Sequence, residues 1–187
     1  MGGYPYVPAR LQWPRARGAT PTLLIVHSME APEKGDTAET CARYFQTAAA
    51  GGSAHLCVDV DSIVQSVPFA MKAAGARGAP YRGKTVNDYA VHFEHAGYAR
   101  QTAADWADDY SVKMLFWSAI AAAEVCKTYA IPTVALTVGQ LRGGAAGITT
   151  HRDVSAAFNV PGGHTDPGPA FPMAGYVANV AYWLARA

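Results

Sequence analysis

The segment TLLIVHS (22–28) is a continuous apolar run of strand length that ends at a histidine. A run without polar alternation indicates a strand buried on both faces, and such strands lie inside sheets that helices cover. Helical and strand patterns alternate along the rest of the chain. Helical periodicity is found at 36–50, at 106–130 and after Pro172. Strand patterns are found at 53–68, which indicates a hairpin, and at 89–97. We therefore expect an α/β fold, a single three-layer domain with a central mixed β-sheet flanked by helices.

The N-terminal segment 1–21 differs from the rest of the chain. It is rich in Pro, Gly, Arg and aromatic residues and has no periodicity, which predicts an irregular arm or the end of a linker. The remaining residues, 22–187, are enough for one domain with a buried core. We expect the functional domain to span 22–187.

Charge and hydropathy exclude several classes of protein. The chain carries 15 basic and 14 acidic residues, and without a basic cluster we expect no nucleic-acid partner. Its apolar runs are far shorter than the roughly 20 residues of a membrane span, and its N-terminus lacks the apolar stretch of a secretory signal. The three cysteines have no CxxC spacing, which favours unpaired thiols. We expect a monomeric globular protein without a membrane partner.

Three residues stand where a strand or loop ends and a cleft could open: His27, His151 and Asp166. Two imidazoles and one carboxylate from separate elements form the ligand set of an open tetrahedral zinc site. Taken singly, each residue has an ordinary structural interpretation, as a core histidine, a surface histidine and a turn former. The segment GHTDPGPAFP (163–172) favours the zinc interpretation, because its prolines stiffen the turn that holds Asp166.

Five segments together match the pattern of a known family: IVHS (25–28), SAHLCVD (53–59), NDYAVHFE (87–94), THRD (150–153) and HTDPGPAFP (164–172). In this order they resemble the zinc-dependent N-acetylmuramoyl-L-alanine amidases, which include phage amidases, cell-wall recycling amidases and animal peptidoglycan-recognition proteins. The resemblance implies a peptidoglycan-recognition-protein-like fold, Zn²⁺ bound by His27, His151 and Asp166, and peptidoglycan as substrate. Residues 94–106 also resemble the amidase domains of endolysins from phages of actinobacteria.

Glu94 is the predicted catalytic base. It is an acid within an apolar strand, and a buried carboxylate needs a reason. The resemblance places it where recycling amidases carry a catalytic glutamate that accepts a proton from the attacking water. The competing interpretation is a structural salt bridge with an arginine.

His164 is the second predicted catalytic residue. The family carries lysine two residues before the metal-binding aspartate, and this chain has His164 there. An imidazole can donate a hydrogen bond to a developing oxyanion, and does so as a cation only if carboxylates hold up its pKa. Other departures are Ala54, Leu56 and the segment KAAG (72–75), which lacks the family's histidine.

Asn87, His92 and His55 lie in the matched segments and are predicted to bind substrate. His92 shares a strand face with Glu94, although the family has glycine there. For His55, packing in the core is the alternative interpretation. His95 faces the other way, which indicates a structural role.

The leading hypothesis is a lytic, endolysin-type zinc hydrolase that cleaves the amide bond between N-acetylmuramic acid and L-alanine. A phage endolysin without a signal peptide would wait in the host cytoplasm until a holin opens the membrane. The alternatives are a non-catalytic peptidoglycan-binding module on the same fold and a zinc peptidase that cuts within the stem peptide.

Overall fold

The computed structural model describes residues 3–187. Its central sheet consists of β2 (Leu23–Ser28), β3 (Leu56–Val58), β4 (Ile63–Gln65), β8 (Ala90–His95) and β9 (Gly147–Thr150). The strand order is β4-β3-β8-β2-β9. All neighbours are parallel except β3 and β4, which form the predicted antiparallel hairpin. The expectation of a mixed sheet is confirmed.

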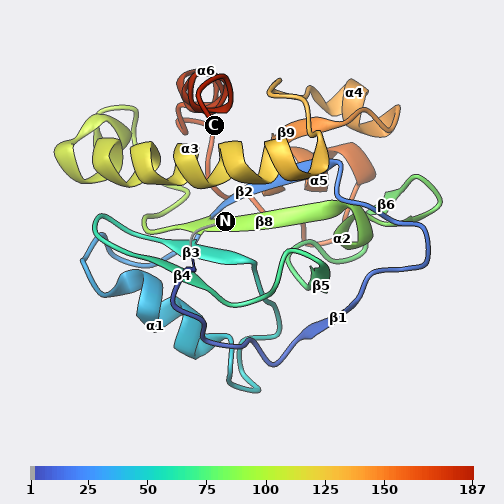
Figure 1. The fold of residues 1–187 in the computed structure, drawn as a ribbon, viewed down its shortest axis with the longest axis horizontal. Coiled ribbons are helices and arrows are strands. Elements are labelled where there is room, and N and C mark those ends of the chain that lie inside the picture. The colour runs from blue at the N-terminus through green and yellow to red at the C-terminus, as the bar shows by residue number, and fades with distance from the viewer. Residues whose placement is uncertain (1–2) are drawn as a thin grey trace.

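Helices cover both faces of this sheet (Figure 1). They are α1 (Thr37–Tyr44), α2 (Val86–Tyr89), α3 (Asp109–Tyr129), α4 (Val138–Arg142), α5 (His151–Phe158) and α6 (Met173–Leu184), with a 3-10 turn at Asp105–Ala107. On one face α1 packs against β3 and β4, and on the other α3 and α6 pack together above the sheet. The predicted three-layer domain is therefore confirmed.

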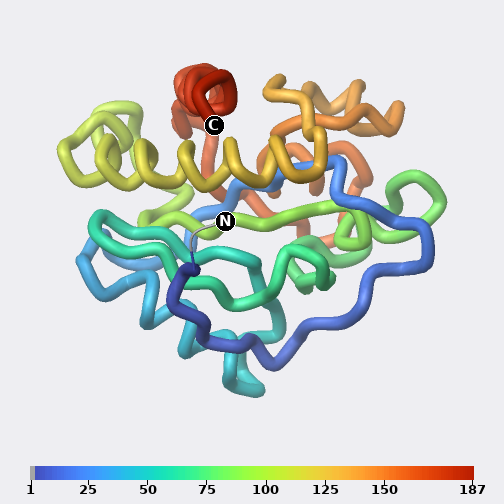
Figure 2. The backbone as a smooth tube through the Cα atoms, viewed as in Figure 1, coloured from blue at the N-terminus to red at the C-terminus, as the bar shows by residue number. Residues whose placement is uncertain are grey.

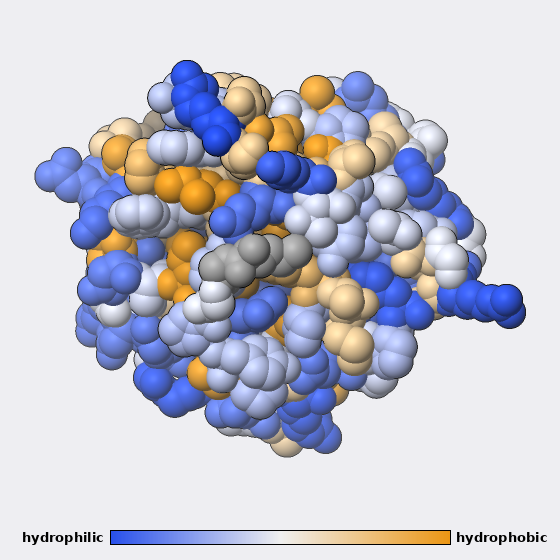
Figure 3. Space-filling model, viewed as in Figure 1, coloured by the Kyte–Doolittle hydropathy of each residue, from blue (hydrophilic) through white to orange (hydrophobic). Residues whose placement is uncertain are grey.

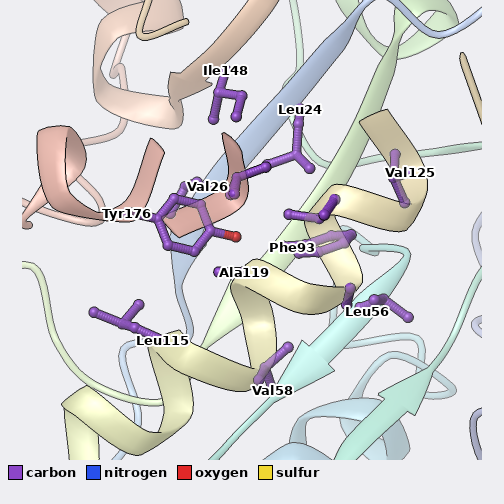
Figure 4. Close-up of a cluster of buried hydrophobic side chains, with 14 of the residues drawn as sticks. Leu24, Val26, Leu56, Val58, Phe93, Leu115, Ala119, Val125, Ile148 and Tyr176 are labelled. Atoms are coloured by element: carbon purple, nitrogen blue, oxygen red, sulfur yellow. The ribbon is translucent and has the colours of Figure 1, made fainter. Parts of the chain in front are cut away.

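The main hydrophobic core lies between the sheet and the α3–α6 layer (Figure 4). Its side chains include Leu24, Val26, Leu56, Val58, Phe93, Leu115, Ala119, Val125, Ile148 and Tyr176. β2 is buried along its whole length, as its unbroken apolar run predicts. Its rigid position at the centre of the sheet fixes the histidine near its end.

The longest helix, α3, is capped at its N-terminus by Asp108, whose carboxylate accepts a hydrogen bond from the Ser111 N–H. Its C-cap is Ala130, a residue in the left-handed conformation that is followed by Ile131 and Pro132. Its outer face and that of α6 keep several large apolar side chains exposed: Val112, Phe116, Trp117 and Tyr182. Figure 3 shows hydrophobic side chains gathered on this part of the surface.

The N-terminal arm is not irregular throughout, contrary to the sequence prediction. Figure 2 shows residues 3–21 running along the edge of the molecule before the chain enters β2. Within it, β1 (Gln12–Pro14) pairs antiparallel with β5 (Met71–Ala73). A three-residue strand carries too little periodicity to be recognised, and its partner lies far away in the sequence. Outside the arm, β6 (Pro80–Tyr81) and β7 (Lys84–Thr85) form a separate short hairpin.

Arg15 fastens the end of the arm to the domain. Its guanidinium donates hydrogen bonds of 2.9–3.0 Å to the backbone carbonyls of Phe69, Asn87, Asp88 and Ala90. These carbonyls lie around the start of β8, so the arm supports the strand that carries Glu94. Among residues 3–187, no helix has both the length and the apolar character that a membrane crossing requires.

Candidate active site

His27, His151 and Asp166 converge, as the sequence predicts. His27 is the penultimate residue of β2, and His151 is the first residue of α5, directly after β9. Because β2 and β9 are parallel neighbours, their carboxyl ends open on the same edge of the sheet. Asp166 arrives from the loop between α5 and α6, and its carboxylate lies 3.1 Å from Nδ1 of each histidine, through Oδ2 to His27 and through Oδ1 to His151.

The geometry of this triad fits a zinc ion. One ligand atom from each residue lies within 4.8 Å of the others, and all three residues are buried. Zinc bonds of about 2.0–2.2 Å at tetrahedral angles place neighbouring ligand atoms roughly 3.3–3.5 Å apart. Oδ2 of Asp166 comes close to that spacing, at 3.1 Å from Nδ1 of His27 and 3.3 Å from Nδ1 of His151. Three protein ligands leave the fourth position open, which is typical of a catalytic site.

The charges of the triad also suit a cation. Burial alone would raise the pKa of Asp166, but hydrogen bonds from His151 and His27 bring it well below the usual value. The carboxyl group is therefore ionised. Burial lowers the pKa of His151, although Asp166 opposes the shift, so a neutral imidazole is favoured there, as a metal ligand requires.

Glu94 lies beside the triad. In the pairing of β2 with β8 it stands opposite His27, and its side chain lines the same cleft. Its Oε2 atom is shielded from solvent and has no hydrogen-bond partner among the described residues. Burial, followed by the proximity of Cys41, Asp166 and Glu30, raises the pKa of Glu94 well above its usual value.

A structural salt bridge does not explain Glu94, because it forms no ion pair within residues 3–187. A carboxylate with a raised pKa is a stronger base than an exposed one. The geometry therefore fits the predicted proton acceptor.

His164 lies at the mouth of the site. Its ring stacks on that of His151 with the centroids 4.0 Å apart, and its Nδ1 is 3.5 Å from Asp166. The side chain is 60% exposed, so a substrate can reach it. Partial burial and His151 lower its pKa, and the opposing effect of Asp166 is smaller. The lowered pKa of His164 favours a neutral hydrogen-bond donor, not the cation that support from carboxylates would give.

His55, His92 and Asn87 lie outside the cleft that the triad opens into. The two imidazoles are completely buried, and none of the three residues lines the cleft. Asn87 accepts a hydrogen bond from the Ala76 N–H and so holds the neighbouring loop. Strand alternation places His92 on the side of Glu94, but it does not reveal that the segment 74–79, between β5 and β6, covers this position. For His55 and His92 the predicted contact with substrate conflicts with this burial, whereas for Asn87, which is half-buried, substrate binding stays a prediction.

Five of the six histidines form a continuous row from the core to the cleft. Ring centroids are 5.8 Å apart for His55 and His92, 5.2 Å for His92 and His27, and 4.6 Å for His27 and His151. The row ends with the stacked ring of His164. The ligands His27 and His151 therefore lie between the imidazole of His92 on the core side and that of His164 on the cleft side.

The sixth histidine, His95, supports the backbone of a ligand. Its Nδ1–H donates to the His27 carbonyl at 3.0 Å, because a carbonyl can only accept. Its Nε2 then accepts from the Ser118 hydroxyl at 2.6 Å, which in turn accepts from Tyr176 at 2.8 Å. The structural role predicted for His95 is confirmed.

The cleft has a volume of about 300 Å³ and extends from the triad towards α1. Its lining includes Glu30, Tyr44 and Arg77, which the sequence analysis missed. Glu30 adopts a positive φ of 51°, and its carboxylate accepts from the Ser28 hydroxyl at 2.7 Å. Arg77 comes from the segment 74–79 between β5 and β6, where nothing in the sequence pattern indicated a functional side chain.

This geometry can be compared with known proteins. The profile of the Amidase_2 family, described as N-acetylmuramoyl-L-alanine amidase, matches residues 17–169. The chain belongs to this family. It is an N-acetylmuramoyl-L-alanine amidase, a hydrolase whose substrate is peptidoglycan, and the buried triad is its zinc site. Since all three ligand positions are retained, the alternative of a non-catalytic module is not supported.

Solved structures share the amidase fold. AmpD is 22% identical with a TM-score of 0.68, and the match covers 96% of each chain. The Staphylococcus aureus hydrolase AmiA, solved with its ligand, is 17% identical with a TM-score of 0.67, covering 97% of this chain and 82% of that one. A mutant endolysin from Bacillus subtilis is 16% identical with a TM-score of 0.63, covering 96% and 99%. No curated protein matches the amidase chain.

Proposed function

We propose that this amidase is a lytic enzyme that cleaves the bond between N-acetylmuramic acid and L-alanine in the intact cell wall, with Glu94 as its base. The observation that carries the proposal is the position of Glu94, opposite His27 and inside the cleft that also contains His151 and Asp166. A base next to an open metal site is the arrangement that amide hydrolysis by water needs.

The triad would hold zinc through Nδ1 of His27, Nδ1 of His151 and a carboxylate oxygen of Asp166. Bound there, zinc would supply Lewis acidity, which polarises a carbonyl and makes water more acidic. Glu94 takes one proton from the attacking water as its oxygen adds to the amide carbon. When the carbon–nitrogen bond breaks, Glu94 returns that proton to the leaving nitrogen of L-alanine. The products are a lactyl carboxylic acid on the sugar and a stem peptide with a free amine.

His164 contributes a hydrogen bond in this scheme. Its exposed ring lies next to Asp166 and His151 at the open side of the site. From there an imidazole N–H donates to the carbonyl oxygen as negative charge develops on it. His164 would thus replace the lysine that the family carries at this position.

Two further observations support the lytic role. The likeness of residues 94–106 to phage endolysin domains agrees with the structural match to the Bacillus subtilis endolysin. The cleft is also open to solvent along one side, as a substrate embedded in a polymer requires. In this proposal the protein is of phage origin and remains in the host cytoplasm until a holin releases it to the wall.

The test compares two substrates. Purified enzyme is incubated with insoluble cell-wall sacculi and with soluble muropeptides, and the release of stem peptides is followed by mass spectrometry. A lytic enzyme clears the sacculi and releases stem peptides from them. Cleavage of the soluble muropeptides alone would indicate a recycling enzyme and would contradict the lytic role while leaving the amidase chemistry intact.

A further inference from the structure

The two ring nitrogens of His27 face different partners. Nδ1 points to Asp166, at 3.1 Å, and so towards the centre of the triad. Nε2 points away from the cleft and lies 3.0 Å from Nδ1 of His92. A ligand histidine usually donates its second N–H to a carboxylate, a carbonyl or water. Here the partner is another imidazole.

The metal decides the direction of this hydrogen bond. To bind zinc, Nδ1 of His27 must present its lone pair, so the ring proton has to sit on Nε2. That N–H can bond only to an acceptor, and Nδ1 of His92 is the atom in reach. His92 must therefore carry its own proton on Nε2.

His92 is held firmly in this position. Its ring stacks on His55 with an interplanar angle of 10°, and its backbone N–H donates to Nδ1 of His55 at 3.0 Å. His55 then donates from Nε2 to the Met71 carbonyl at 3.1 Å. On the other side, a Cβ at Gly75 would lie 2.5 Å from Cγ of His92. The ring thus fills a slot that exists because residue 75 has no side chain.

Packing alone does not account for a histidine at this position. Nε2 of His92 is buried and has no hydrogen-bond partner among residues 3–187, and a buried polar atom without a partner reduces stability. An apolar side chain would fill the same space without that cost. The one hydrogen bond that the ring makes is the contact with His27.

We propose that His92 is a positioning residue that accepts the Nε2–H of His27 and so holds the zinc ligand in its binding tautomer and orientation. The inference rests on the zinc site of the proposed function but not on the lytic role or on the assignment of Glu94.

Two near-isosteric substitutions test it. His92→Asn keeps an acceptor oxygen close to the position of Nδ1, whereas His92→Leu has the same size and no acceptor. Zinc affinity is measured by competition with a chromophoric chelator, and thermal unfolding of the metal-free variants reports on stability. We expect His92→Leu to bind zinc roughly 10- to 100-fold more weakly, since this is the usual effect of losing a partner behind a ligand. His92→Asn should recover most of that loss.

If the Leu and Asn variants bind zinc as tightly as the wild type, His92 does not position His27. The same conclusion follows if both lose affinity equally, because a packing role does not distinguish an acceptor from a methyl group. If instead the His27→Ala variant binds zinc as tightly as the wild type, the zinc site itself is wrongly assigned. The two failures are therefore separable.

Nitrogen-15 NMR of the zinc-loaded wild type gives an independent readout that does not depend on any variant. We expect the proton of His27 and the proton of His92 both on Nε2. A His92 ring protonated on Nδ1 would point the hydrogen bond the other way and contradict the proposal.

Gly75 offers a steric probe of the same contact. Gly75→Ala should push the His92 ring away from His27 and weaken zinc binding in the wild type, whereas in a His92→Ala background the added methyl group meets no ring. The loss should therefore disappear in the double variant. An unchanged affinity in Gly75→Ala, or an equal loss in both backgrounds, would contradict the coupling.

Discussion

His27 and Glu94 stand opposite each other on the adjacent parallel strands β2 and β8. Paired residues in such strands project from the same face of a sheet, so a ligand of the metal and the proposed base enter one cleft from the most rigid part of the fold. Both strands are buried in the centre of the sheet. The distance between the two side chains therefore depends little on the surrounding loops.

The first prediction concerns the base. Glu94→Gln keeps the shape of the side chain but cannot accept the proton, so turnover on purified peptidoglycan should fall roughly 100- to 10,000-fold with zinc content unchanged. Glu30→Gln is the matched control, because Glu30 lines the same cleft and already accepts hydrogen bonds from Ser28 and Ala99. Equal losses in the two variants would mean that general cleft charge, and not proton transfer by Glu94, is responsible.

A second prediction concerns His164. A donor to the developing oxyanion acts in the transition state, so His164→Ala should lower kcat by about 100- to 1,000-fold with little change in KM or zinc content. His164→Lys, which restores the residue of the family, should recover part of the rate. Wild-type kcat in the alanine variant would show that the stacked ring has no role in the chemistry.

Buried histidines predict a loss of stability in acid. Burial, assisted by the charge of Arg15, lowers the pKa of His55 to about 3. Burial also lowers the pKa of His95 to about 4. A histidine in the unfolded chain has a pKa of about 6.5. Below pH 6.5 the unfolded chain binds protons that the folded chain does not, so folding stability falls as pH falls towards the folded-state values. For these two groups the loss between pH 7 and 5.5 is about 2.5 kcal/mol.

Urea unfolding of the metal-free protein at pH 7 and 5.5 measures this loss. His95→Gln removes one of the two groups, so its stability should fall by about 1.2 kcal/mol less than that of the wild type over the same interval. The same pH dependence in both proteins would rule out His95 as a source of the effect.

Much of the site was predictable because its residues are tied to backbone patterns. His27 ends an unbroken apolar run, and Asp166 lies in a turn with two prolines. His55 and His92 were not placed correctly, because alternation along a strand gives the face of a side chain but not what covers that face. The loop that buries His92 is positioned by β1, β5 and Arg15, contacts between segments too short or too distant for any local pattern.

The last variants concern the zinc ligands, whose substitution should weaken metal binding. Asp166→Asn keeps the size of the side chain but removes the charge that both histidines face, and His27→Ala removes a ligand outright. Each should weaken zinc binding at least roughly 10-fold and abolish lysis. Asp109→Asn, at an exposed acid on α3, is the control for a change of charge elsewhere. Full metal occupancy in both site variants would refute the ligand assignment.

Mass spectrometry of the products from purified peptidoglycan tests the central claim most directly. An N-acetylmuramoyl-L-alanine amidase releases intact stem peptides that begin with a free L-alanine amine and leaves glycan strands with free lactyl carboxyl groups. We expect both products from the wild type and neither after zinc removal by a chelator. Peptides cut between residues of the stem, with L-alanine still attached to the sugar, would show a zinc peptidase and contradict this account.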